Sequence, residues 1–134
     1  MIRGIDHIGI AVADADAALA IFRDALGLEL AETEPVPGQQ LVSYHLRLGE
    51  STLELLHPSD SQSVIAKFLE KKGPGIHHIA LAVDDIVAEA ARLKQRGLQP
   101  LTEQPTLGAG GKRVLFFHPK TTGGVLLELC EGGH

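Results

Sequence analysis

Two pairs of histidine and glutamate residues recur at nearly equal spacing along the chain. His7 precedes Glu54 by 47 residues, and His78 precedes Glu128 by 50 residues. Each glutamate lies between two leucines, where an unpaired carboxylate is costly to bury. Imidazole and carboxylate groups are ligands for Zn²⁺, Co²⁺, Ni²⁺, Mn²⁺ and Fe²⁺. The four residues are therefore predicted to bind one divalent metal ion, with Glu54 open to a second reading as a nearby base.

The two histidines lie at equivalent positions of an internal repeat. Residues 5–12 read IDHIGIAV and residues 76–83 read IHHIALAV, with five identical positions. Side chains alternate across a strand, so one face of each segment carries bulky aliphatic residues. The other face carries the histidine followed by glycine or alanine. Such small neighbours leave volume for a ligand beside the histidine.

The elements that follow each segment also repeat. Helices are predicted over 17–26, with Leu19, Phe22 and Leu26 facing inward, and over 86–96; aspartates precede both and glycines end both. Three strands are predicted after each helix: 28–33, 41–48 and 51–57, then 98–103, 113–118 and 124–130. The chain is therefore expected to be one α+β domain, 1–134, with two βαβββ modules at about 3–58 and 75–131, joined by a helix at about 61–73.

Composition excludes several classes of function. The net charge is −5 and no basic stripe occurs, which argues against nucleic-acid binding. The single cysteine, Cys130, cannot form an internal disulfide, and the N-terminal apolar run is short and carries charge. We therefore expect a cytoplasmic protein without a signal peptide or membrane span. The remaining histidines lack repeat partners or face away, and are not assigned to the site: His45, His57, His77, His118 and His134.

The repeated module with its histidines and glutamates resembles the vicinal oxygen chelate superfamily, and within it the methylmalonyl-CoA epimerases. The stretches that carry this resemblance are DHIGIAV at 6–12, LELLHP at 53–58, SVIAKFLEKKGPGIHHIALAVDDI at 63–86 and GAGGKRVLFFHPKTTGGVLLEL at 108–129. The resemblance implies paired modules whose mixed sheet curls into a cleft. It also implies one divalent metal ion, often cobalt, a coenzyme A thioester substrate and a homodimer.

One position departs from the pattern of this family. Some members carry a glutamate on the third strand that is thought to act as a second base. The matching residue in this chain is about Ser43, and serine is a poor base. The resemblance therefore does not identify the second proton carrier.

The expected reaction is the interconversion of (R)- and (S)-methylmalonyl-CoA. Removal of the α-proton would form a metal-chelated enolate, and return of the proton on the other face would invert the centre. Glu128 and Glu54 are the candidate acid/base pair. The loop containing Gly110, Gly111 and Lys112 is the candidate binding site for the polar end of the substrate, because glycines expose backbone N–H groups.

Two alternatives use the same fold. A glyoxalase-I-like lyase (lactoylglutathione lyase) would use the same four ligands and similar proton chemistry. A metal-free small-molecule binding protein would generally lack the ligand set that this chain keeps. Metal analysis separates the second alternative from an enzyme, and parallel assays separate the first from an epimerase.

Overall fold

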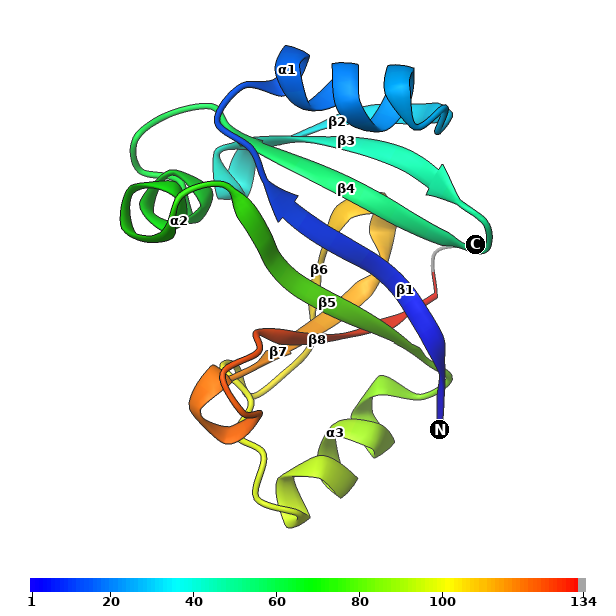
Figure 1. Ribbon diagram of the computed structural model, residues 1–134. Helices are drawn as coiled ribbons and strands as arrows, with labels where there is room; N and C mark the ends of the chain where they lie inside the picture. Colours follow the sequence, from blue (N-terminus) through cyan, green and yellow to red (C-terminus); the bar gives the residue numbers. More distant parts are fainter. Residues whose placement is uncertain (133–134) are drawn as a thin grey trace. The chain divides into compact units, whose positions relative to one another are not determined.

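The computed structural model describes residues 1–132, which leaves His134 outside the described part of the chain. The chain divides into two compact units. The first runs from His7 to His77, and the second combines Met1–Asp6 with the chain from His78 onward. Figure 1 shows the elements of both. No helix among the described residues is long and apolar enough to cross a membrane.

The first unit contains a four-stranded mixed sheet in the order β2-β3-β4-β1. Its strands are β1 (Ile2–Ala11, in this unit from His7), β2 (Leu30–Val36), β3 (Leu41–Leu48) and β4 (Ser51–Pro58). β1 and β4 are parallel, and the other neighbours are antiparallel. The helices are α1 (Ala15–Leu19), continued by the π-helix η1 (Ala20–Ala25), and α2 (Val64–Lys72), with the short 3₁₀ segment η2 (Pro37–Gln39).

The second unit repeats this arrangement in the order β5-β8-β7-β6. Its strands are β5 (Gly75–Val83, in this unit from His78), β6 (Thr106–Leu107), β7 (Arg113–Phe117) and β8 (Leu127–Glu131). Its helix is α3 (Ile86–Gln95), and two 3₁₀ segments are η3 (Ala109–Gly111) and η4 (Pro119–Thr121). β5 and β8 are parallel, as β1 and β4 are. The predicted α+β class with two tandem βαβββ modules is therefore confirmed.

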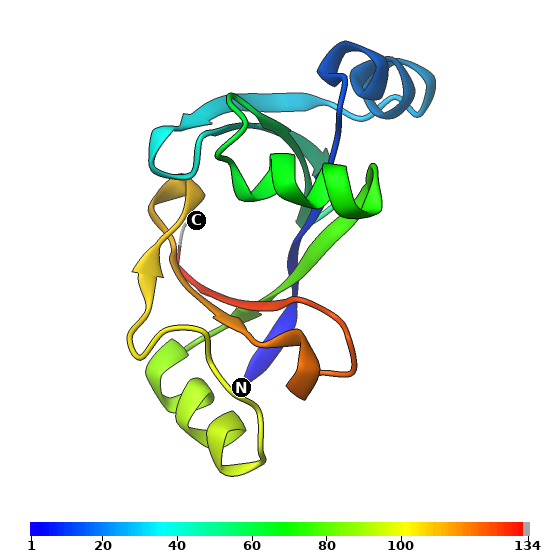
Figure 2. The ribbon, with the colours of Figure 1, turned by 90° about the vertical axis from the view of Figure 1, so that its left-hand side faces the viewer.

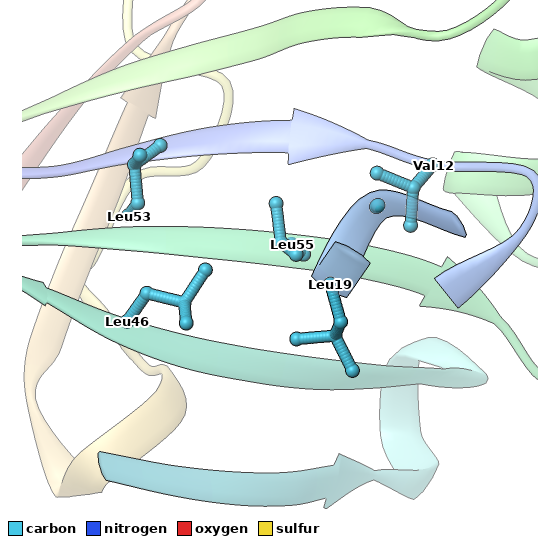
Figure 3. Packing of buried hydrophobic residues seen from close by; sticks show 6 residues of the cluster. Val12, Leu19, Leu46, Leu53 and Leu55 are labelled. Atoms are coloured by element: carbon cyan, nitrogen blue, oxygen red, sulfur yellow. The ribbon is translucent and has the colours of Figure 1, made fainter. Parts of the chain in front are cut away.

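One face of the first sheet packs against α1. Figure 3 shows Leu19 of α1 directed toward Leu46 and Leu55 of the strands, with Val12 and Leu53 in the same cluster. Asp14 begins the helix, because its side chain accepts a hydrogen bond from the Ala17 N–H at 3.0 Å. This apolar contact fixes which face of each strand turns away from α1.

The opposite face is covered by α2 over one end only, as the two helices lie on opposite sides of these strands (Figure 2). Ile65 of α2 packs against Ala11, Leu41 and Leu56, which are all buried. Ser63 caps this helix through the Ile65 N–H. Polar residues further along β1, β3 and β4 occupy the rest of that face.

The core of the second unit has the same design. Ile86 and Ala90 of α3 pack against the bulky face of the strands. Buried partners on the strands are Val83, Leu115, Phe117 and Leu129. The other face of this sheet carries small residues and the second histidine–glutamate pair.

Three expected elements differ from the structure. Leu26 was expected to face inward but is 62% exposed, because the π-helical turns of η1 shift the residues after Leu19 around the axis. The expected strand at 98–103 is absent: Pro100 makes only an isolated bridge to Phe117, and β6 forms later. The last strand begins at Leu127 rather than at Gly124, whose φ of 93° belongs to a turn.

A carboxylate on α3 makes the stability of the second unit sensitive to pH. Glu89 is 4% exposed and accepts a hydrogen bond from Arg92 Nε at 2.9 Å. Hydrogen bonding to Arg92 lowers the pKa of Glu89, although burial opposes the shift. A lowered folded-state pKa stabilises the fold above the unfolded pKa, and this stabilisation is lost as the pH falls through the folded value.

We predict that Glu89→Gln lowers the free energy of unfolding by about 1 kcal/mol at pH 7 and by much less at pH 3. Urea unfolding at both pH values measures the difference. Asp24→Asn is the control, because Asp24 forms an exposed pair with Arg23. An equal loss from Glu89→Gln at both pH values would contradict the assignment.

Candidate metal centre

The first candidate pair is built by two parallel strands of the first unit. Gly9 of β1 is register-paired with Glu54 of β4, and His7 lies two residues before Gly9 on the same face. His7 and Glu54 are each 5% exposed, and the His7 Nδ1 atom lies 3.4 Å from Glu54 Oε2. The absence of a side chain on Gly9 leaves room for this contact. The first unit therefore brings two of the four predicted ligands, His7 and Glu54, into contact.

The second pair has the same construction. Ala80 of β5 is register-paired with Glu128 of β8, and His78 again lies two residues earlier. The His78 Nε2 atom lies 3.0 Å from Glu128 Oε1, and both residues are buried. The Phe116 ring meets the His78 ring edge-on, with centroids 5.4 Å apart. The repeat seen in the sequence thus extends to the placement of the two histidine–glutamate pairs.

Each pair suits a divalent metal ion by its chemistry. A neutral imidazole offers one nitrogen lone pair, and a carboxylate offers two oxygens; both are borderline to hard donors. A buried carboxylate in an apolar strand needs a cation or hydrogen-bond donors, and the neighbouring imidazole supplies one contact. Glu128 also accepts a hydrogen bond from the Cys130 thiol, with Sγ 3.4 Å from Oε2. This thiol fixes one oxygen of the second carboxylate.

His45 belongs to the surroundings of the first pair, although the sequence analysis did not assign it. β3 is antiparallel to β4, and His45 is register-paired with Glu54. The His45 Nδ1 atom lies 3.8 Å from Glu54 Oε2. The sequence does contain a signal for this pairing. A tight turn that pairs Leu48 with Ser51 also pairs His45 with Glu54, because both lie three residues further from the turn. The internal repeat did not indicate His45, because the second module has no equivalent histidine.

The glycine-rich loop before β7 is anchored rather than loose. Gly110 and Gly111 have φ values of 72° and 73°, which favour glycine. Lys112 is 8% exposed, and its Nζ atom donates a hydrogen bond to Asp6 Oδ2 at 2.6 Å. The lysine charge is therefore neutralised within the second unit. A role of this loop in substrate binding stays a prediction, and it would depend on the backbone N–H groups more than on the ammonium.

Two other unassigned histidines contact the backbone. His57 Nδ1 lies 3.3 Å from the Val12 carbonyl oxygen. His118 begins η4 and accepts a hydrogen bond from the Lys120 N–H through Nδ1 at 3.3 Å. His77 packs edge-on against the Phe68 ring. These contacts are structural, and they make His118 a useful control for the histidines of the candidate site.

Comparisons with known proteins agree along nearly the whole chain. A model of the Glyoxalase/Bleomycin resistance protein/Dioxygenase superfamily matches residues 6–116. An ethylmalonyl-CoA/methylmalonyl-CoA epimerase of Cereibacter sphaeroides is 44% identical, over 96% of this chain and 98% of that protein. The methylmalonyl-CoA epimerase structure from Mycobacterium tuberculosis is 40% identical with a TM-score of 0.93, over 99% of this chain and 90% of that one.

A further solved structure is described as a methylmalonyl-CoA epimerase in complex with methylmalonyl-CoA and NH₄⁺. It is 38% identical to this chain, with a TM-score of 0.93, and the match covers 98% of this chain and 96% of that one. The similarity therefore extends to a protein captured with an acyl-CoA.

We predict that the Asp6–Lys112 ion pair stabilises the second unit. Lys112→Met should lower the free energy of unfolding by about 2–4 kcal/mol, because the Asp6 carboxylate loses its buried counter-charge. The double variant Asp6→Asn, Lys112→Met should recover part of this loss. Urea unfolding of the three proteins measures both effects. Unchanged stability of Lys112→Met together with a raised KM would instead assign the lysine to the substrate.

Proposed function

Because the chain belongs to the glyoxalase/bleomycin resistance protein/dioxygenase superfamily, we propose that it is a metal-dependent methylmalonyl-CoA epimerase. The observation that carries the proposal is the matched construction of the two buried pairs, His7–Glu54 and His78–Glu128. Relatives about 40% identical to the chain are named as epimerases of this substrate, which supports the same substrate class. The proposal has three parts: the ion, the proton transfer and the binding of the thioester.

The four residues of the two pairs would hold one divalent metal ion. The ion would supply Lewis-acid stabilisation of the negative charge that develops on the substrate. Its donors would be two imidazole nitrogens and two carboxylate oxygens, a set that admits several metals. Co²⁺ is our first choice from the resemblance, with Zn²⁺, Ni²⁺, Mn²⁺ and Fe²⁺ as alternatives.

The two glutamates would carry the proton. Methylmalonyl-CoA has one hydrogen on a carbon between a thioester carbonyl and a carboxylate. One glutamate takes this proton, so that the C–H electron pair moves into the thioester and forms an enolate. A proton returned to the opposite face then completes the inversion, and the number of protons is conserved. Glu128 and Glu54 are our candidates, since both are buried beside an imidazole.

Substrate binding and assembly complete the proposal. The glycine loop would contact the polar end of the acyl-CoA through the N–H groups of Gly110 and Gly111, whose positive φ directs consecutive backbone amides. We further propose that the protein is a homodimer, which the resemblance implies. Its single cysteine fits a reducing compartment such as the cytoplasm. Light scattering on the purified protein tests the dimer.

We predict that His78→Ala, purified without chelator, contains one equivalent of metal less than the parent chain and loses epimerase activity. The expected reason is the loss of one imidazole ligand, the His78 ring that lies 3.0 Å from Glu128. Elemental analysis and a coupled epimerase assay provide the two measurements. His118→Ala is the matched control, because His118 serves only the η4 turn. Unchanged metal content in His78→Ala would refute the ligand assignment and favour a metal-free binding protein.

We predict that Glu128→Gln slows exchange of the substrate α-proton in deuterated water by about 100-fold or more. The amide keeps the size of the side chain but cannot accept the proton. NMR of methylmalonyl-CoA measures the exchange directly. Glu131→Gln is the control, because Glu131 is a carboxylate three residues further along β8 that accepts a hydrogen bond from the Ile86 N–H.

Retained exchange in Glu128→Gln would exclude this residue as an essential base. A glutathione hemithioacetal assayed in parallel separates the epimerase from the glyoxalase-I-like alternative. Turnover of the hemithioacetal without turnover of methylmalonyl-CoA would reverse our choice between them.

A further inference from the structure

A second group of possible ligands lies wholly within the first unit. Glu32 and Glu34 on β2 and His45 on β3 each offer one donor atom, and these atoms all lie within 4.8 Å of one another. Glu32 is register-paired with His45, so their side chains leave the same face of the sheet. We propose that these three residues, the β2–β3 cluster, bind a divalent transition-metal ion at a site separate from the two histidine–glutamate pairs.

The imidazole of His45 is placed as a metal ligand. Its Nε2 atom is buried and has no hydrogen bond, and Glu34 Oε1 lies 3.7 Å away, beyond hydrogen-bond distance. Its Nδ1 atom faces Glu54 Oε2 at 3.8 Å. Metal-bound histidines commonly direct their second ring nitrogen at a carboxylate, which fixes the tautomer and the ring orientation. Both ring nitrogens of His45 thus lie near carboxylates but beyond hydrogen-bond distance of them, and Nε2, which faces the β2–β3 cluster, is available to a bound cation.

Ser43 is an independent observation on the same face as this cluster. It is 1% exposed, and its Oγ atom has no hydrogen-bond partner. Ser43 is register-paired with Glu34 and lies two residues before His45 on the same face. A buried hydroxyl without a partner costs about 1–3 kcal/mol. Water molecules on a bound cation would give this hydroxyl a partner, which removes the penalty.

Charge decides between a cation and an anion as the ligand. Glu32, Glu34 and Glu54 all lie close to the His45 ring. Arg47, the next residue on the same face of β3, already pairs with Glu29 at 3.2 Å. A carboxylate or phosphate group would therefore meet net negative charge, whereas a divalent cation would be attracted.

The donor types narrow the cation further. One imidazole and two carboxylates match the ligands of Zn²⁺, Co²⁺, Mn²⁺ and Fe²⁺, whereas Ca²⁺ and Mg²⁺ prefer oxygen alone. The described structure supplies three protein ligands, so water would complete the coordination. β2 is the outer strand in the order of this unit, and a bound ion would tie it to β3.

The test is a calorimetric titration of the metal-stripped protein with Zn²⁺ alone. Elemental analysis of the loaded protein then gives the number of bound ions. The parent chain is expected to bind two equivalents. The variant Glu32→Gln, which changes an exposed side chain, should weaken one of them by about tenfold or more, and Glu32→Gln with Glu34→Gln should abolish it. Glu29→Gln is the matched control, since Glu29 lies next to β2 but outside the β2–β3 cluster. Circular dichroism confirms that each variant is folded.

The result is independent of the proposed epimerase site. His78→Ala should lose the first equivalent and keep the second, while the double glutamine variant should do the reverse. A parent chain that binds only one equivalent, which His78→Ala then removes, would overturn the second site and leave the first intact. Unchanged binding of two equivalents by the double variant would also overturn the proposal.

Discussion

The functional face of each unit depends on the register of one pair of parallel strands. Gly9 opposite Glu54 and Ala80 opposite Glu128 place a residue without bulk across from a buried carboxylate. A histidine two residues earlier on the same face can then reach that carboxylate. A shift of one residue would send the glutamate into the apolar core, where no donor meets it. Packing of α1 and α3 on the opposite faces prevents such a shift.

This division between the two faces of a sheet explains which features the sequence predicts well. Alternation of bulky and small residues identifies the packed face, and the repeat identifies the histidines and glutamates of the other face. Both are local patterns, and both agree with the structure. Leu26 was misplaced because a π-helical turn leaves no signature in the spacing of apolar residues. The strand expected at 98–103 is reduced to a single bridge between Pro100 and Phe117, and the short strand that pairs with β7 forms later, at Thr106–Leu107.

Contacts between segments that are far apart in the chain could not be predicted from local sequence patterns. Lys112 belongs to the loop expected to bind the polar end of the substrate, yet its ammonium forms a buried ion pair with Asp6, 106 residues away. No periodicity links those two positions. His45 was closer to being found, because a turn of known register implies its pairing with Glu54. His45 has no counterpart in the second module, so the internal repeat does not point to it.

The features that break the repeat therefore make the two glutamates chemically different. Oε2 of Glu54 has an imidazole nitrogen on two sides, from His7 at 3.4 Å and from His45 at 3.8 Å. Glu128 has one imidazole and a thiol donor, Cys130, instead. The duplicated module has thus diverged at His45 and Cys130, so that the two buried carboxylates have unlike polar neighbours.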